Sequence, residues 1–562
     1  MAEIAKNKND SLDKVIECIN NKKSFLLEAG AGSGKTWSLI ESLKYILKEQ
    51  SEKLKKSNQQ IVCITYTNVA KDEISERIDN NHLVFVRTIH EFLWEVIRNY
   101  QIELKKVLIE YNNEQKPGKK IEDLEKKLNT INIEYTQYGR SFENGRITHD
   151  DVIEFSSKIF DSYPKISKIV ANKYPYIFVD EYQDTEERTV KLLIDKLLYN
   201  NAGNIVIGFF GDSMQKIYNQ GIGVIKSDKL ETITKEDNYR CSLKVIDLLN
   251  KIRPALTQKP SGKNVVGEIS FFCFNNDLSN ENNYKKVFEY LTSQKGWDTE
   301  KTKVLMLTHK VIANKLDYNN LLNIYDKHHS FGRNRLFEKE ERFSDLFFNK
   351  IENLAFLYKE KKYGEFIQIL AKEGFKFSHH KHKGEIKEQM DELNQLRNTG
   401  TIKQVLDYIF EKQLITKPQK IKDFENEITA NKDSEDCVKK KRFYDDLMKV
   451  KYQEVINLGG FIEERTPFST KHGVKGAEYE NVLMVIDDNS WNQYSFNDVF
   501  SNNQKNQDRY NRTLNLLYVC CSRAKDKLAI LALSNMDVGA MKTIENWFGK
   551  NNMYDPSIFN SK

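Results

Sequence analysis

The segment EAGAGSGKT, residues 28–36, limits the possible folds of this chain more than any other feature of its sequence. It follows the apolar residues Phe25, Leu26 and Leu27 and precedes the helix-compatible segment WSLIESLKYIL. A strand, a glycine-rich turn and a helix in this order place backbone N–H groups and a helix N-terminus around a phosphate group. The segment therefore predicts a P-loop, although Ala29 stands where the usual pattern has its first glycine. The alternative is a glycine-rich turn that binds no ligand.

Continuous apolar runs rich in β-branched residues recur along the chain. Strands that are buried on both faces of a parallel sheet show such runs instead of strict alternation. The runs span residues 61–65, 83–86, 176–179, 205–210, 304–307, 482–486 and 528–531. Two stretches without such runs, about 95–160 and 331–454, are charged and have helical spacing. We therefore expect an α/β frame with two helical insertions.

The overall composition excludes some classes of protein. The chain has 39% hydrophobic and 30% charged residues, no apolar run long enough to cross a bilayer, and no apolar signal-peptide core at its N-terminus. Its seven cysteines show neither CxxC pairs nor zinc-ligand spacing, which predicts buried free thiols. The formal net charge of +6 is small for 562 residues, so nucleic acid would have to bind a local face. We expect a cytoplasmic protein without a membrane partner.

Two motifs together supply the groups that hydrolysis of a nucleoside triphosphate requires. Lys35 is expected to bridge the β- and γ-phosphates, and Thr36 to give its hydroxyl oxygen to Mg²⁺. In YIFVDEYQDT, Asp180 is expected to bind Mg²⁺ either directly or through a water ligand of the ion, and Glu181 to be the base that polarises the attacking water. An acidic pair at a strand end can also be a solvated turn or a helix cap. Its combination with a P-loop favours the hydrolytic site.

Nine motifs follow one another in a fixed order. They are GAGSGKT (30–36), ITYTNVAKDEISERI (64–78), RTIHEF (87–92), THDDVIEF (148–155), VDEYQDT (179–185), FGDSMQKIY (210–218), NYRCS (238–242), STKHGVKGAEYENV (469–482) and LLYVCCSRAK (516–525). This series resembles that of the superfamily 1 helicases of the UvrD, Rep and PcrA type. The resemblance implies a DNA-dependent ATPase with a P-loop NTPase fold: two tandem RecA-like parallel-sheet domains, each with a mainly helical insertion.

The resemblance also implies a division of the chain into six segments. The first RecA-like domain is expected at 1–94 and 161–252, with its helical insertion at 95–160. The second is expected at 253–330 and 455–562, with a reduced helical insertion at 331–454.

Individual roles at the nucleotide site are implied by the same motifs. Gln215 matches the residue that contacts the γ-phosphate, and Arg240 and Arg523 match two arginine fingers. Planar, permanently charged guanidinium groups suit the charge that spreads over a transferring phosphoryl group. Tyr239 matches the aromatic residue that stacks on adenine, and Glu478 the carboxylate that binds the ribose. The other implied nucleotide contacts are Gly30, Gly32, Ser33, Gly34 and Gly476.

Single-stranded or tailed duplex DNA is the implied partner, and the family moves along it in the 3′ to 5′ direction. Hydroxyl, amide and imidazole donors suit phosphate contacts, and an aromatic ring gives a base a face that tolerates any sequence. The residues that match the DNA contacts of the family are Tyr66, Thr67, Asn68, Thr88, His90, Thr470 and His472.

Three departures from the family pattern bear on this function. No glutamine precedes Gln50, so the upstream glutamine that reads adenine is missing. After GDSMQKIY the chain has residues 219–222 (Asn, Gln, Gly, Ile) in place of Gly-Trp-Arg-Gly, which removes a base-stacking tryptophan. The second insertion is also shorter than in the full-length helicases.

Two functions therefore stay open on the sequence. The main expectation is an ATP-dependent 3′–5′ single-stranded DNA translocase or helicase. The alternative is a DNA-sensing regulatory ATPase that controls a partner nuclease without processive unwinding. The segment after Arg523 is too short for the nuclease domain fused to some relatives, so a nuclease is expected as a separate subunit. A compact chain of this kind also resembles the helicase-like subunit of Gabija-type anti-phage defence systems, whose partner is a nuclease.

Overall fold

The computed structural model forms two compact units. The first comprises Met1–Asn283, Lys475–Val482 and Asp487–Lys562, and the second comprises Tyr284–Val474 and Leu483–Ile486. The structure describes residues 10–65, 68–116, 118, 120–136, 139–216, 221–274, 280–306, 309–328, 332–337, 339, 341–375, 381–430, 434–463, 468–470, 477–488 and 493–559.

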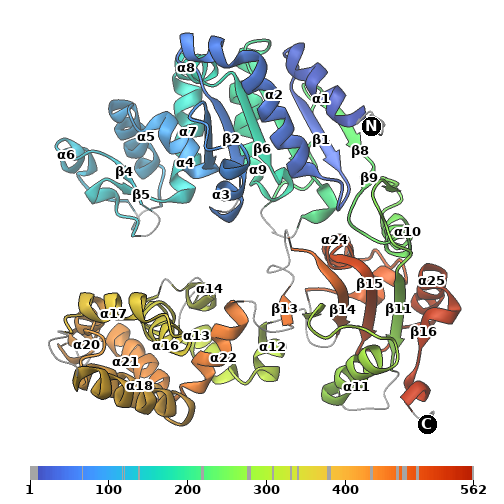
Figure 1. Ribbon diagram of the computed structural model, residues 1–562. Helices are drawn as coiled ribbons and strands as arrows, with labels where there is room; N and C mark the ends of the chain where they lie inside the picture. Colours follow the sequence, from blue (N-terminus) through green and yellow to red (C-terminus); the bar gives the residue numbers. More distant parts are fainter. Residues whose placement is uncertain are drawn as a thin grey trace. The chain divides into compact units, whose positions relative to one another are not determined.

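The N-terminal part of the first unit is built on a six-stranded parallel sheet, in the order β3-β2-β6-β7-β1-β8 (Figure 1). All five residues of β2 and all five of β6 are buried, as their continuous apolar sequences predict. The carboxyl ends of the strands share one edge of the sheet. The strands are β1 (Phe25–Ala29), β2 (Ile61–Thr65), β3 (Val84–Thr88), β6 (Tyr176–Asp180), β7 (Val206–Gly211) and β8 (Glu231–Lys235).

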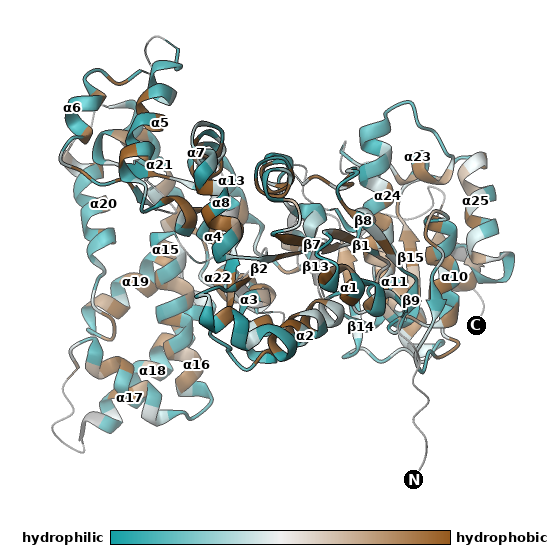
Figure 2. Cartoon of the chain, turned by 90° about the horizontal axis from the view of Figure 1, so that it is seen from above, coloured by the Kyte–Doolittle hydropathy of each residue, from teal (hydrophilic) through white to brown (hydrophobic). Residues whose placement is uncertain are grey.

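Two hydrophobic cores cover the two faces of this sheet. Successive side chains of a strand point to opposite faces, so Phe25 and Leu27 belong to one core and Leu26 to the other. Figure 2 shows β1, β2 and β7 in the brown of apolar residues. One core packs against α1 (Asp10–Asn20), α2 (Lys35–Lys56) and α3 (Asn68–Arg77), and the other against α4 (Ile89–Ile97), α7 (His149–Ser162) and α8 (Pro164–Lys173).

The chain between α4 and α7 is mainly helical, as its composition predicts. It also contains one short parallel pair, β4 with β5, which the charged sequence did not reveal. Its elements are α5 (Gln101–Asn113), α6 (Leu124–Leu128), β4 (Glu134–Tyr135), η1 (Phe142–Asn144) and β5 (Arg146–Ile147). Short helical turns connect β6, β7 and β8, namely η2 (Tyr182–Asp184), α9 (Glu187–Lys191), η3 (Leu192–Leu198), η4 (Tyr199–Asn201) and η5 (Ser213–Gln215).

A second parallel sheet contributes β11 (Glu268–Cys273), β15 (Ala524–Ala532) and β16 (Met553–Tyr554) to the first unit, with β11 paired to both others. Between β8 and β11 in the chain, β9 (Asp237–Asn238) and β10 (Lys259–Pro260) form a short parallel pair. The helical elements of this part are α10 (Leu243–Ile252), α23 (Phe496–Phe500), α24 (Gln507–Cys521), α25 (Val538–Phe548), η7 (Lys550–Asn552) and η8 (Pro556–Phe559). β14 (Tyr479–Ile486) and α11 (Asn280–Ser293) pass from one unit to the other.

The second unit is predominantly helical. Its strands are β12 (Thr302–Met306) and β13 (Phe468–Thr470), which pair in parallel, and the Leu483–Ile486 part of β14, which neighbours β12 in the sheet. Aromatic residues form much of its core, with the ring of Phe343 packed against those of Phe424 and Phe443. The helices are α12 (His309–Lys315), α13 (Asn319–His328), α14 (Gly332–Phe337), α15 (Arg342–Ser344), η6 (Asp345–Glu352), α16 (Asn353–Lys359), α17 (Tyr363–Lys372), α18 (Lys381–Thr399), α19 (Ile402–Glu411), α20 (Gln419–Ala430), α21 (Glu435–Lys449) and α22 (Gln453–Ile462).

The predicted fold class is confirmed, because parallel sheets are combined with mainly helical insertions. The six segment boundaries stay a prediction. All seven cysteines are buried and free, as expected. Within the described residues, none of the helices combines the length and the apolar character that crossing a bilayer requires.

Candidate functional site

The P-loop joins the end of β1 to the start of α2. Gly34 precedes α2 with φ 78° in the left-handed region, and Lys35 is the first residue of the helix. Because a glycine has no side chain to cap a helix, the first amides of α2 receive no oxygen from this residue. Thr36 is the second residue of the helix, and Ser33, directly before Gly34, is buried. This local geometry is that of an anion-binding loop.

Two glycines of the loop lie in close contact with residues outside it. A Cβ atom on Gly32 would lie 2.7 Å from the Cβ of Arg240 and 2.9 Å from Oδ1 of Asn238, and its φ of 68° is also left-handed. A Cβ atom on Gly30 would lie 2.2 Å from Nε2 of Gln258. The loop is therefore in direct contact with residues that follow the first sheet in sequence.

The acidic pair lies at the carboxyl end of β6, on the same edge of the sheet as the P-loop. Asp180 is the last residue of the strand and is 5% exposed. Glu181 follows with φ 49°, a strained conformation for a residue with a Cβ atom. The side chain of Gln183 donates to Oε2 of Glu181 at 2.5 Å and accepts from the backbone N–H of Asp212 at 3.1 Å. Gln183, which sequence analysis did not single out, thus fixes the orientation of the expected base.

Gln215 and Arg523 meet directly. Nη2 of Arg523 donates to Oε1 of Gln215 at 2.8 Å, and Nε2 of Gln215 donates to Oδ2 of Asp212 at 2.7 Å. Arg523 is only 1% exposed. Burial, together with the nearby charge of Arg240, lowers the pKa of Arg523 to about 10, while Glu181 opposes this shift. The guanidinium group therefore keeps its charge at neutral pH.

Arg240 is held by a carboxylate. Its Nη2 lies 2.8 Å from Oε1 of Glu478, and Oε2 of Glu478 lies 3.0 Å from Nζ of Lys525. Burial alone would raise the pKa of Glu478, but Arg240 and Lys525 lower it. The backbone N–H of Tyr239 donates to the carbonyl oxygen of Gly32 at 2.9 Å, and its side chain is 49% exposed. An exposed phenol ring thus lies beside the P-loop.

A buried charge network that sequence analysis missed lies next to these groups. Nη1 of Arg253 donates to Oδ1 of Asp212 at 2.7 Å, and Nη2 of Arg253 donates to Oε1 of Glu28. The hydroxyl of Tyr182 donates to the other oxygen of Glu28. Burial raises the pKa of Asp212, an effect that the charges of Arg253 and Lys35 oppose. Glu28, inside an otherwise apolar strand, is the one sequence feature that could have pointed to such a partner.

The backbone of Ala31 in the P-loop is held at both polar atoms. Its N–H donates to the hydroxyl of Tyr518 at 3.1 Å, and its carbonyl oxygen accepts from Nε2 of Gln258 at 2.7 Å. Gln258 is 3% exposed, and its Oε1 has no hydrogen-bond partner. Trp37, in the first turn of α2, is 45% exposed and offers a further aromatic surface near the loop. None of these three side chains was a sequence-based candidate.

The predicted DNA contacts are less fully described. Thr88 caps α4 in a capping box with Glu91. The imidazole ring of His90 stacks on that of His149, with 4.3 Å between the ring centroids. Burial, and to a smaller extent the charge of His149, lowers the pKa of His90 to about 4. Asn68 is the first residue of α3, and Thr470 ends β13 in the second unit. Tyr66, Thr67, His472 and the nucleotide-site candidate Gly476 lie outside the described residues.

The expected Mg²⁺ partners are consistent with how this ion binds. Among the described residues no group of three or more histidine, cysteine, aspartate or glutamate side chains is placed to hold a metal ion. Mg²⁺ usually needs only one or two protein ligands, because substrate phosphates and water complete its octahedron. The Thr36 hydroxyl at the helix start and the buried carboxylate of Asp180 fit that requirement.

The chain is similar to several known proteins. Residues 13–220 match a family described as AAA domain. The chain is 27% identical to the Gabija protein GajB of Bacillus cereus (strain HuB5-5), over 94% of this chain and 96% of that protein. It is 28% identical to the ATP-dependent DNA helicase PcrA of Staphylococcus epidermidis (strain RP62A), over 47% of this chain and 42% of that protein. For PcrA of Staphylococcus aureus (strain COL) the identity is 29%, over 42% and 39%.

These similarities confirm the predicted resemblance to UvrD/PcrA-type helicases and to the Gabija system. The match spans nearly all of GajB but less than half of each PcrA protein. The roles assigned to individual residues stay predictions.

Proposed function

We propose that this protein is an ATP-dependent 3′–5′ single-stranded DNA translocase or helicase. The observation that carries the proposal is the contact between Arg523 and Gln215. Arg523 follows α24, which packs with the second sheet, and its buried guanidinium group reaches a glutamine that follows a strand of the first sheet. A cation and an amide at this position can register whether a γ-phosphate is present between the two sheets.

We assign a residue to each step of hydrolysis. Lys35 and the amides at the start of α2 hold the β- and γ-phosphates, and Tyr239 stacks on the base. Glu181, oriented by Gln183, accepts a proton from the attacking water. The water oxygen bonds to the γ-phosphorus while the bond to the β–γ bridging oxygen breaks. Arg523 stabilises the charge on the transferring group.

Arg240 requires a rearrangement before it can act. Its guanidinium group is paired with Glu478, the carboxylate proposed to bind the ribose. Binding of ATP would exchange this pair for two contacts with the nucleotide, from Arg240 to phosphate and from Glu478 to the ribose hydroxyls. Thr36 and Asp180 would hold Mg²⁺, which neutralises phosphate charge when it is bound. We propose that Tyr66, Thr67, Asn68, Thr88, His90, Thr470 and His472 contact the DNA strand.

The test is strand separation by the purified full chain, on 3′-tailed and 5′-tailed duplexes, with ATP hydrolysis followed in the same reactions. We expect the 3′-tailed duplex alone to be separated. A Lys55→Gln variant serves as the control, because Lys55 is an exposed lysine of α2 whose partner is Glu52. Separation of the 5′-tailed duplex alone would refute the proposed direction.

A second function is favoured by the extent of the match to GajB. The similarity covers 94% of this chain and 96% of that protein, far more than the match to PcrA. A DNA-sensing ATPase that controls a separate nuclease in anti-phage defence, in the cytoplasm, is therefore the alternative proposal. In the same reactions, hydrolysis that DNA stimulates without strand separation would favour this alternative. Hydrolysis that is indifferent to DNA would contradict both functions.

A further inference from the structure

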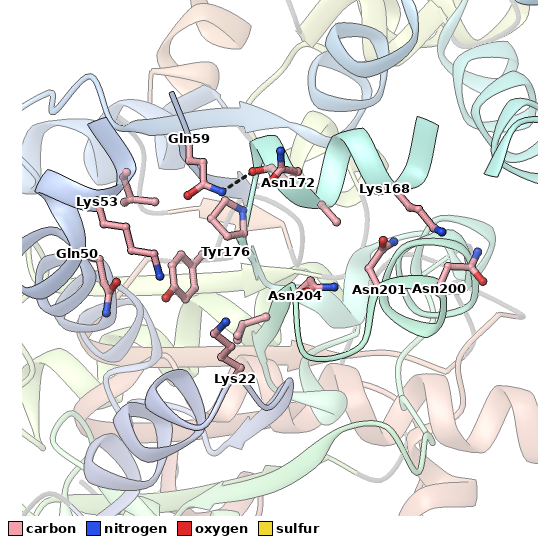
Figure 3. Close-up of a pocket in the computed structure, with 14 residues that line it drawn as sticks. Lys22, Gln50, Lys53, Gln59, Lys168, Asn172, Tyr176, Asn200, Asn201 and Asn204 are labelled. Carbon is pink, nitrogen blue, oxygen red and sulfur yellow. Dashed lines mark hydrogen bonds between the residues drawn. The ribbon is translucent and has the colours of Figure 1, made fainter. Parts of the chain in front are cut away.

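A cavity of about 540 Å³ opens at the edge of the first sheet opposite the P-loop. Its walls come from the C-terminal part of α2, from α8, and from the residues where β6 and β7 begin, including Tyr176 (Figure 3). The P-loop, in contrast, follows the carboxyl end of β1. The volume lies within the range of about 300–1,000 Å³ that is typical of small-molecule sites.

Three lysines line this cavity, and none of its lining residues is acidic. Lys22, Lys53 and Lys168 approach from three different segments, and none of them pairs with a described carboxylate. In Figure 3, Lys22 and Lys53 extend toward the space beside Tyr176, and Lys168 lies next to Asn201. Three cations without a counter-charge create a positive potential that a bound anion would relieve.

A neighbouring cavity at the same edge of the sheet differs, because carboxylates line it together with lysines. It also has Lys22 in its lining, with Lys23 and Lys229, but Asp228 and Glu231 line it too. Lys23 pairs with Glu231 at 3.5 Å, and Lys229 with Asp228 at 3.5 Å. Two of the three lysines of that second cavity therefore have a carboxylate partner within the protein.

Amide side chains supply most of the remaining polar lining of the lysine cavity. Among them are Gln50, Gln59, Asn172 and Asn204. The side-chain Nε2 of Gln59 donates a hydrogen bond to the carbonyl oxygen of Asn172 at 2.7 Å, which links two segments of the cavity wall. Amides offer a donor and an acceptor side by side, which suits the edge of a nucleobase or the hydroxyls of a sugar. Lysines suit the phosphate of a ligand, and amides suit an uncharged polar part of the same ligand. The lining is therefore complementary to a molecule that has both parts.

We propose that this cavity is a second binding site, separate from the P-loop, for a small phosphate ester of mononucleotide size. Lys22 and Lys53, which extend toward the space beside Tyr176, bind its phosphate, and Lys168 and the amides contact the rest of the ligand. The site lies at the opposite ends of the same strands, so its existence does not depend on the hydrolysis proposed for the P-loop.

The test is isothermal titration of the full chain with AMP and with inorganic phosphate, in a Lys35→Ala background. AMP is the suitable probe because its single phosphate cannot span the β and γ positions that Lys35 is proposed to hold. We expect one saturable site that binds AMP at least about tenfold more tightly than inorganic phosphate. Replacing both Lys53 and Lys168 by glutamine should weaken AMP binding about tenfold or more.

Matched controls make this test specific. Lys55→Gln on α2 and Lys165→Gln on α8 remove exposed lysines of the same helices that do not line the cavity. Both should leave AMP affinity unchanged. Three results would overturn the proposal: no saturable binding, equal affinity for AMP and inorganic phosphate, or equal losses in the control variants. Displacement of AMP by single-stranded DNA would also overturn it, in favour of a polynucleotide surface.

Discussion

The two edges of the first sheet arrange positive charge in opposite ways. At the carboxyl edge Arg253 and Arg523 are buried, and each has named partners within 3 Å, Asp212 and Gln215. At the amino edge the lysines that line the cavity are exposed and pair with none of the described carboxylates. Both edges face anions in our proposals, but only one of them holds its cations rigidly.

The difference reflects what each edge has to do. A buried charge is tolerated only when hydrogen bonds and counter-charges fix it, and that fixed geometry is what stabilises a transition state. An exposed lysine has a flexible stem and a hydrated charge, so it can bind an anion but cannot position it within a fraction of an ångström. Substitutions should therefore affect chemistry and folding at the carboxyl edge, and only affinity at the amino edge.

The largest effect should come from Lys35. Lys35→Ala removes the cation at the start of α2, and we expect ATP hydrolysis to fall to the background rate. The measurement is release of inorganic phosphate by the purified protein in the presence of single-stranded DNA. The control is Lys55→Gln on the same helix. Hydrolysis by Lys35→Ala at the wild-type rate would show that the P-loop is not the catalytic site.

Arg523→Ala should lower kcat by about 10³-fold or more, if Arg523 acts on the transferring phosphoryl group. Arg523→Lys should remain strongly impaired, because an ammonium group cannot reproduce the planar contact with Gln215. Steady-state kinetics with saturating DNA separate the two parameters. A rise in KM with an unchanged kcat would instead make Arg523 a residue of ground-state binding.

Arg253→Leu should lower the free energy of unfolding by about 3–5 kcal/mol, because it leaves the carboxylates of Asp212 and Glu28 buried without their cation. Lys53→Gln, at the other edge, should change it by less than about 0.5 kcal/mol. Denaturant unfolding of both variants gives the comparison directly. If both variants unfolded with the same free energy, the proposed difference between buried cations at the carboxyl edge and exposed cations at the amino edge would be wrong.

The smallest effect concerns His90 at the carboxyl end of β3. An unfolded histidine has a pKa of about 6.5, and burial lowers that of folded His90 to about 4. Between these values the unfolded chain binds a proton that the folded chain does not. Stability from this group is therefore complete above about pH 6.5 and is lost as the pH falls toward 4. His90→Gln should flatten this part of a stability–pH profile, whereas His82→Gln, on an exposed histidine, should not.

The same contrast explains what the sequence could predict. β2 was predicted to the residue, because a strand buried on both faces is apolar throughout. β8 (Glu231–Lys235) was not, because only Ile233 and Lys235 of its five residues are buried. The motif residues of the nucleotide site follow local patterns of glycine, acid and strand, so they could be named in advance.

The supporting network could not be predicted in this way. Arg253 meets Glu28 across 225 positions of the chain, and Gln258 meets Ala31 across 227. No local pattern marks an arginine or a glutamine for burial, since both are usually exposed. Such partners become visible only when the fold brings the two sheets together. The lysine cavity was missed for the same reason, because its three lysines come from separate segments.

The helix α2 joins the two edges. Its 22 residues correspond to a rod of about 33 Å, with Lys35 at one end and Lys53 near the other. Because α2 connects the two proposed sites, a ligand that favours one position of α2 would change the affinity at the other end as well. Thermodynamic linkage makes that influence mutual: whatever factor AMP imposes on the affinity for ATP, ATP must impose on the affinity for AMP.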